Sequence, residues 1–283
     1  MSALLALVSS VLWGTADFLG GSASRRIPVA TVLGLSQLTA LLGLVPVAVL
    51  TGELGADRSY LLPAIGAGLV GMSALAAFYR ALATGTMGVV APIASLGVVV
   101  PIAVGLLRGE TPSGTQLAGI AVAVAGVVLA SGPELRGDGR GGAAPLLLAL
   151  GAAVGFGLTL VLIAQGASSS VVMTLLTMRL TAVGLLTSLL LGFAGHRGFD
   201  LGITRSGLPL VAAVGAGDVL ANGTFAIATA QAGAFVSVTA VLASLYPVVT
   251  VLLARQFDHE RLRRVQVIGV VGALGGVVLL ASG

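Results

Sequence analysis

The chain is a succession of apolar runs, each long enough to cross a lipid bilayer as a helix. Of its 283 residues, 57% are hydrophobic and only 8% are charged. A soluble domain of this length carries more charge on its surface, whereas a bilayer core about 30 Å thick is spanned by about 20 apolar residues in an α-helix. The composition therefore predicts an all-α integral membrane protein.

Ten runs of this kind lie between polar or Gly/Pro-rich breaks, so we predict ten transmembrane helices. The predicted spans are residues 3–22, 29–50, 61–83, 86–107, 112–131, 143–164, 171–193, 208–230, 233–254 and 264–282. Prolines at positions 92, 101 and 247 are expected to interrupt or bend two of these helices.

The two halves of the chain resemble each other. ALATGTMG at residues 81–88 matches AIATAQAG at residues 226–233. A spaced series also recurs at one constant offset: Glu110, Gln116, Gly119 and Gly126 correspond to Glu260, Gln266, Gly269 and Gly276. We therefore predict an internal duplication, with a first five-helix repeat at 1–132, a polar linker at 133–142 and a second repeat at 143–283.

An odd number of helices per repeat reverses the direction in which the second repeat starts. The repeats are then inverted and related by a pseudo-twofold axis in the membrane plane, an arrangement typical of secondary transporters. Such transporters bind their solutes near the bilayer midplane, between the repeats. We expect the binding site of this chain to lie there.

At this point the chain resembles the EamA family of the drug/metabolite transporter superfamily. The resemblance is carried by Trp13-Gly14 in the first predicted helix, Tyr246-Pro247 in the ninth, and the Glu, Gln, Gly series that includes Glu110 and Glu260. It covers essentially the whole chain as two five-helix copies. It implies a ten-helix transporter of small metabolites or drug-like compounds, often moving them outward.

Four ionisable residues lie inside predicted spans: Asp17, Arg80, Arg179 and Asp218. An isolated charge at the bilayer centre costs about 2.5 to 3.5 kcal/mol, so each is expected to face the bundle interior and to seek a partner. Arg179 and Asp218 have similar depths near the midplane, whereas Asp17 and Arg80 lie late in helices that end on the same face. Two pairs are therefore predicted, Arg179 with Asp218 and Asp17 with Arg80.

Each pair has a structural and a functional interpretation. The pairs can simply fix helix register, and Arg80 can extend its head group to the interface. Alternatively, Arg179 and Asp218 bind charged groups of the solute, while Asp17 and Arg80 serve a gate or a proton-coupling step nearer one face.

Four further residues are candidates for the solute site. Trp13 lies one helical turn before Asp17, too deep for an interfacial anchor, and either lines a cavity or packs in the core. Asn222 lies one turn after Asp218 on the same helical face. Gln37 corresponds roughly to Arg179 in the other repeat. Tyr246 either reaches the same cavity or donates its hydroxyl to a carbonyl freed by Pro247.

Glu110 and Glu260 each follow a predicted helix and precede the next. We interpret them as polar groups that fix a surface loop, through a hydrogen bond or a salt bridge to Arg108 or Arg261.

The loop arginines give an orientation that differs from the family expectation. Odd-numbered connections carry ten, namely Arg25, Arg26, Arg136, Arg140, Arg197, Arg205, Arg255, Arg261, Arg263 and Arg264; even-numbered ones carry Arg58 and Arg108. By the positive-inside rule, the odd connections are cytoplasmic and both termini are outside. The family resemblance implies termini inside.

The leading functional prediction is a secondary active transporter in the plasma (inner) membrane, an exporter of small solutes with possible proton coupling. A channel or a non-transporting membrane scaffold is the alternative. An enzyme is not expected, because no HExxH, GxSxG or Walker A motif occurs. No cofactor, metal or nucleic-acid partner is predicted; the expected partners are a small-molecule solute and the lipid bilayer.

Overall fold

The computed structural model of the chain describes residues 2–107, 113–115, 117–119, 121–122, 125–126, 129, 142–194, 202–232, 242–243, 245–259 and 262–282. Within these ranges all regular secondary structure is helical. The fold class predicted from composition is thus confirmed as all-helical.

Six helices are long and apolar enough to cross a membrane. They are α1 (Ser2–Ser24), α2 (Val29–Thr51), α3 (Leu61–Thr84), α7 (Ala143–Ala167), α8 (Val171–Ala194) and α9 (Leu208–Ala232). Each begins and ends within three residues of a predicted span. The count of ten spanning helices stays a prediction.

Four shorter helices occupy the other predicted spans that the structure describes. They are α4 (Met87–Ala94), α5 (Val99–Leu107), α11 (Tyr246–Phe257) and α12 (Arg264–Ser282). Short 3-10 turns, η1 (Glu53–Gly55), η2 (Arg58–Tyr60), η3 (Ser95–Val98) and η4 (Arg205–Gly207), lie within or beside the connections.

The predicted continuous span at 86–107 is interrupted. The turn η3 separates α4 from α5, between Pro92 and Pro101. A proline inside a helix removes one backbone donor and its ring clashes with the preceding turn, so the carbonyls before it need other partners. At the start of η3 the Ser95 hydroxyl donates to the Pro92 carbonyl oxygen at 2.7 Å, so a side chain bonds to this carbonyl where the α-helix is interrupted.

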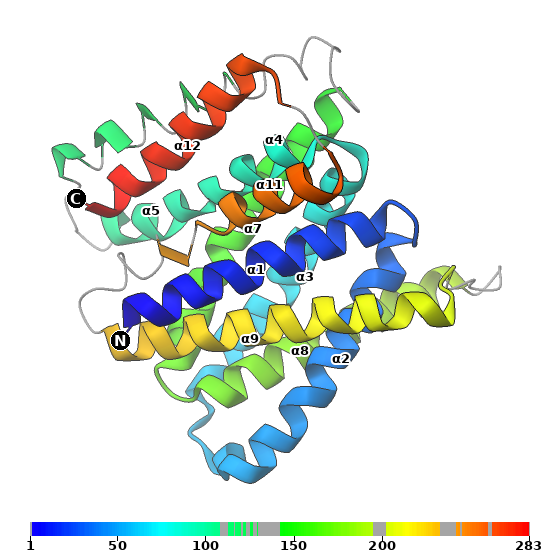
Figure 1. The fold of residues 1–283 in the computed structure, drawn as a ribbon. Coiled ribbons are helices and arrows are strands. Elements are labelled where there is room, and N and C mark those ends of the chain that lie inside the picture. The colour runs from blue at the N-terminus through cyan, green and yellow to red at the C-terminus, as the bar shows by residue number, and fades with distance from the viewer. Residues whose placement is uncertain are drawn as a thin grey trace.

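Close helix packing depends on glycines at the contact surfaces. Helix α1 lies along α9 in Figure 1, and α1 also contacts α11. A β-carbon added at Gly14 would meet the backbone carbonyl of Tyr246, and one added at Gly20 would meet the ring of Tyr79. Small residues let transmembrane helices approach in this way where apolar burial alone offers no drive.

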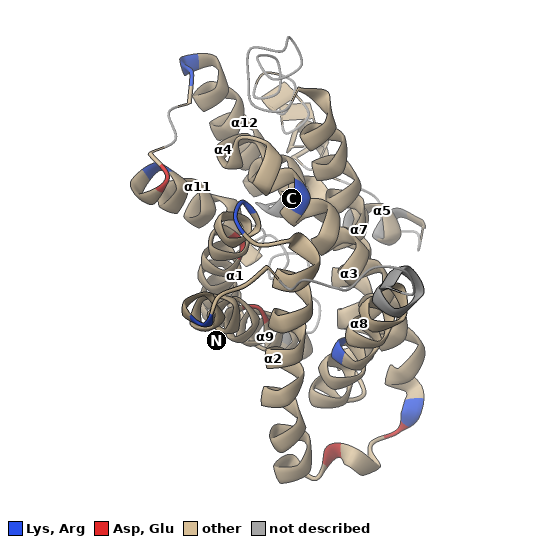
Figure 2. Cartoon of the chain, turned by 90° about the vertical axis from the view of Figure 1, so that its right-hand side faces the viewer, with Lys and Arg blue, Asp and Glu red and all other residues tan. Residues whose placement is uncertain are grey.

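The molecule has two ends, which we name by one residue each. The Arg25 end comprises residues 25–28, 202–207, 258–259 and 262–264; an ion pair joins Arg25 to Asp258, and Gly202 lies against Pro28. The Glu53 end comprises residues 51–60 and 168–170, where the Ser170 hydroxyl donates to the Glu53 carboxylate. Figure 2 shows most of the charged residues at helix ends and in connections, with long uncharged stretches between them.

Candidate functional site

A cavity of about 100 Å³ lies among α1, α2, α3, α7, α8, α9 and the start of α11. Seven of the eight candidates from the sequence line it: Trp13, Asp17, Gln37, Arg179, Asp218, Asn222 and Tyr246. The rest of the wall is largely apolar and includes Met72, Leu75, Leu160 and Ile163. Both halves of the chain contribute to it.

The expected pairing of Arg179 with Asp218 is present. Arg179 Nη1 on α8 lies 2.8 Å from Asp218 Oδ2 on α9, and the two side chains are 5% and 14% exposed. The contact is close but not aligned as a hydrogen bond, because Oδ2 has no hydrogen-bond partner among the described residues. Charge attraction therefore joins the two groups at this contact.

Each member of the pair has a neutral amide beside it. Gln37 Oε1 accepts a hydrogen bond from Arg179 Nη1 at 2.7 Å. One turn after Asp218, Asn222 Nδ2 donates to Asp218 Oδ1 at 2.9 Å. Gln37 and Asn222 therefore supply some of the hydrogen bonds that the buried arginine and aspartate still need beyond their own contact.

One edge of the Arg179 guanidinium is unused. Its Nε and Nη2 groups are buried and have no hydrogen-bond partner in the described part of the chain. These two N–H groups point the same way in a guanidinium, as a fork that matches a carboxylate or another amide oxygen.

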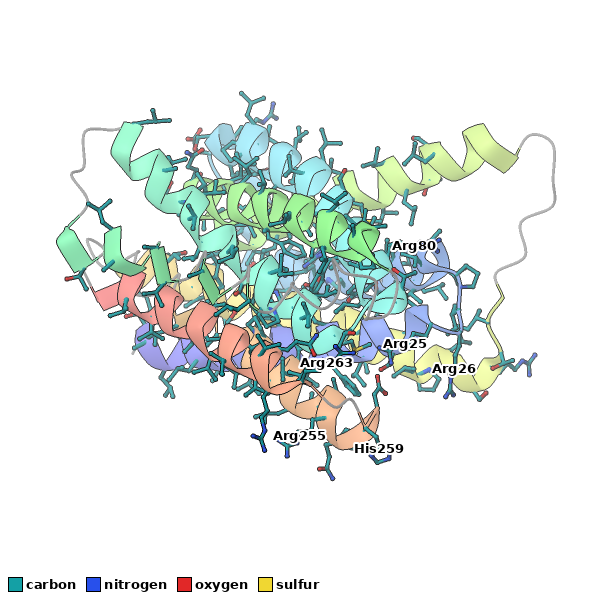
Figure 3. The ribbon with its side chains drawn as sticks, turned by 90° about the horizontal axis from the view of Figure 1, so that it is seen from above. Arg25, Arg26, Arg80, Arg255, His259 and Arg263 are labelled. Atoms are coloured by element: carbon teal, nitrogen blue, oxygen red, sulfur yellow. The ribbon has the colours of Figure 1, made fainter. Side chains whose placement is uncertain are left out.

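The expected pairing of Asp17 with Arg80 is wrong. Asp17 is 7% exposed and lines the cavity, whereas Arg80 is exposed to the outside of the bundle. The position of a residue along a helix gives its depth in the bilayer but not the direction in which its side chain points around the helix axis. Tyr79, one position before Arg80, is 1% exposed and occupies the inner face of α3. In Figure 3, Arg80, Arg25 and Arg26 lie in the right-hand half of the view.

Asp17 is consequently the cavity acid without a counter-charge. Within the residues that the structure describes, no hydrogen bond or ion pair joins its carboxylate to another side chain. Asp218 is the only other acid that lines the described cavity, and it already has Arg179.

Aromatic rings form one side of the cavity. Trp13 lies 5.6 Å from Phe225 and 6.5 Å from Tyr246, the latter edge-on with an interplanar angle of 70°. Trp13 therefore both lines the cavity and packs in the core. The Tyr246 hydroxyl is buried and has no hydrogen-bond partner among described residues, so the predicted bond to a freed carbonyl is not found there.

The sequence reasoning missed a contact that closes the Arg25 end. Arg25 Nη1 lies 2.6 Å from Asp258 Oδ2, and the Ser22 hydroxyl donates to the same oxygen at 3.3 Å. Phe18 and Phe257 pack beneath it with ring centroids 5.9 Å apart. Arg25 and Asp258 follow the ends of α1 and α11, so their only sequence signal is opposite charge at two helix ends. The loop roles predicted for Glu110, Glu260, Arg108 and Arg261 lie outside the described residues.

Apolar helices around a polar intramembrane cavity define a multi-pass membrane protein. The EamA-like transporter family model matches residues 1–132 and 143–282. The chain therefore belongs to the EamA-like transporter family, whose members are membrane transporters of the drug/metabolite transporter type.

No curated protein sequence matches the chain. Among solved structures, 27 chains match. One of them, described only as "Crystal structure of protein", has a TM-score of 0.68 and 21% sequence identity, and the match covers 98% of this chain and 95% of that one. At this identity the likeness supports the shared fold alone.

Proposed function

We propose that this protein is a secondary active transporter that carries a small solute through the cavity by alternating access. The observation that carries the proposal is the cavity itself, where seven residues chosen for their chemistry, from both halves of the chain, meet. Inward-facing ionisable residues in membrane helices typically mark solute or ion pathways.

The helix pairings support two inverted repeats that rock against each other. In the repeat correspondence, α1 is equivalent to α7 and α3 to α9. The two most extensive helix contacts, α1 with α9 and α3 with α7, exchange under this correspondence. Gln37 and Arg179, which occupy roughly equivalent positions, bond to each other. Rigid-body rocking of such repeats around a central site is the usual transport movement.

In this proposal the solute contacts Arg179, Asp218, Trp13, Asn222, Gln37 and Tyr246, the polar and aromatic groups of the cavity wall. Asp17, the acid without a counter-charge, takes up and releases a proton or a cationic group during the cycle. The gating role expected of Arg80 passes to Arg25 and Asp258, because Arg80 lies outside the cavity and the Arg25 pair bridges α1 and α11.

The cavity is displaced toward the Glu53 end. Its α7 wall, from Phe156 to Ile163, and most of its α3 wall, from Ala67 to Met72, lie in the halves of these helices nearer that end. The lining residues Asp17, Gln37 and Asp218 lie close to the middle of their helices, on the Arg25 side. Toward the Arg25 end the interior is filled by Phe18, Phe78, Tyr79, Leu82 and Met87. This arrangement corresponds to a transporter closed at its Arg25 end.

The arginine distribution orients this state. Six described arginines lie at or beside the Arg25 end, namely Arg25, Arg26, Arg205, Arg255, Arg263 and Arg264, against Arg58 at the other. With the Arg25 end in the cytoplasm, the cavity faces the outside of the plasma (inner) membrane, as an exporter does just after release. A reporter that functions only in the cytoplasm can be fused after Gly283. Activity of this fusion would show that the C-terminal end is cytoplasmic and would contradict the orientation.

Flux into proteoliposomes tests the function. A panel of metabolites is offered with and without a pH gradient to wild type, Asp17→Asn and Asp218→Asn. We expect saturable flux of at least one solute, lost in Asp218→Asn and uncoupled from the pH gradient in Asp17→Asn. Flux that never saturates would indicate a channel, and no flux of any solute would favour a scaffold.

A further inference from the structure

The charges of the acidic and basic side chains that line the cavity do not sum to zero. Asp17, Asp218 and Arg179 line it, and the arginine is matched by Asp218 at 2.8 Å. With both acids ionised, the lining therefore carries one negative charge that nothing in the described structure neutralises.

The unbalanced charge is placed where a ligand can reach it. Asp17 is more than nine-tenths buried, with 7% of its surface exposed, and it belongs to the cavity wall. A buried carboxylate is costly unless a cation or a proton accompanies it. An occupant of the cavity that brings a positive charge removes this cost.

The surface next to Asp17 suits an organic cation. Trp13 lies one turn before it on α1, and the Trp13 ring meets Tyr246 edge-on across the cavity wall. Indole and phenol faces attract ammonium groups, more strongly where water is excluded. Met72, Leu75 and Leu160 offer apolar surface for a hydrocarbon part.

An anionic solute fits this arrangement less well. Arg179 is the only cation lining the cavity in the described residues, and Asp218 and Gln37 already occupy its Nη1. An anion would enter a site whose net charge is already negative. The unused Nε and Nη2 groups of Arg179 can donate hydrogen bonds to an anion, but Asp218 already balances the charge of the arginine.

Building on the proposed transport function, we propose that the cavity binds a compact protonated amine. Its ammonium group pairs with Asp17, and its apolar part lies against Trp13 and the neighbouring aliphatic side chains. The Arg179–Asp218 pair then shapes the site as a neutral unit and does not itself bind the solute charge. A cavity of about 100 Å³ limits the ligand to a small molecule.

Trp13 is the only tryptophan of the chain, so its fluorescence reports on this cavity directly. Purified protein in detergent is titrated at pH 7 with three probes of one shape: cyclohexylammonium, cyclohexanol and cyclohexanecarboxylate. We expect a saturable change in Trp13 fluorescence with cyclohexylammonium, and affinity at least about tenfold lower for the other two. Equal or tighter binding of cyclohexanecarboxylate, or no fluorescence response to cyclohexylammonium, would overturn the proposal. This test uses the wild-type protein alone.

Variants then assign the charge to Asp17. Asp17→Asn is expected to weaken ammonium binding about tenfold or more, whereas Asp17→Glu, which keeps the charge, retains most of it. Asp57→Asn is the matched control, because Asp57 is exposed at the Glu53 end. Undiminished binding in a correctly folded Asp17→Asn protein would refute the assignment.

Proteoliposome flux separates this inference from the transport proposal. Charge-selective binding of cyclohexylammonium without flux of any solute would contradict transport but support the amine site. Saturable flux of another solute that cyclohexylammonium does not inhibit would support transport and contradict the amine site.

Discussion

Arg179 and Asp218 come from consecutive helices and form an ion pair inside the bundle, with Nη1 2.8 Å from Oδ2. Their side chains are 5% and 14% exposed, so water solvates neither charge well. A pair of this kind is strongly coupled: each charge is tolerated chiefly because the other is present.

Removing one member should therefore be worse than removing both. We expect Asp218→Ala to destabilise the protein by about 3–5 kcal/mol, because it leaves the Arg179 cation buried alone. The double variant Arg179→Met with Asp218→Leu should regain most of that stability. Unfolding in detergent measures both, with Asp57→Ala as the exposed-acid control. A double variant less stable than either single one would contradict this coupling.

Gln37 should contribute to stability through Arg179. Gln37→Leu keeps the size of a side chain that is 2% exposed but removes the oxygen that accepts from Nη1 at 2.7 Å. The expected loss is about 1–3 kcal/mol, since a buried donor on a charged group loses its partner. Gln165→Leu, at an exposed glutamine of α7, should change unfolding by less than about 0.5 kcal/mol. Similar effects of the two substitutions would argue against the bond.

Gly14 should not tolerate a side chain, because α11 crosses α1 there. A β-carbon at Gly14 would meet the Tyr246 carbonyl oxygen and lie 2.6 Å from Val249 Cβ. Gly14→Ala is therefore expected to lose about 1–3 kcal/mol through overpacking. Gly43→Ala on α2 provides the comparison, since nothing lies within 4 Å of its β-carbon position. Unfolding curves that coincide for the two variants would mean that α11 does not pack as closely as described.

The Arg25–Asp258 pair should hold its end of the cavity closed. The chain has no cysteine, so a single Ala23→Cys, at a residue 3% exposed, can report on access from this end. We expect a membrane-impermeant thiol reagent to label it several-fold faster when Asp258→Ala is added.

The reciprocal exchange, Arg25→Asp with Asp258→Arg, should restore slow labelling. Labelling that is unaffected by Asp258→Ala would show that apolar packing of Phe18 against Phe257, and not the ion pair, seals this end.

Some features of the structure can be predicted from the sequence and others cannot, depending on what determines each feature. Helix extents follow from the length of apolar runs, so α1, α2, α3, α8 and α12 lie close to their predicted bounds. The same arithmetic gives depth, which correctly brought Arg179 and Asp218 together. The four-residue spacing of Asp218 and Asn222 likewise predicted a shared face, and the structure has them bonded at 2.9 Å.

Depth alone does not give the direction of a side chain around its helix. Arg80 has a depth compatible with Asp17, but successive residues of a helix point about 100° apart, and Tyr79 takes the inward direction. In an almost uniformly apolar helix, no hydrophobic stripe distinguishes the two faces. The Arg25–Asp258 contact was missed for a related reason, because it joins the ends of α1 and α11, whose approach depends on tertiary packing at Gly14.

The most direct test of the central claim is to fill the cavity and measure transport. Leu160 and Leu158 lie two positions apart on α7; Leu160 lines the cavity, whereas Leu158 is 38% exposed on the outside of the helix. Saturable proteoliposome flux of a solute carried by wild type should fall at least about tenfold in Leu160→Trp and stay near wild type in Leu158→Trp. Unchanged flux in a correctly folded Leu160→Trp protein would contradict the claim that solute passes through this cavity.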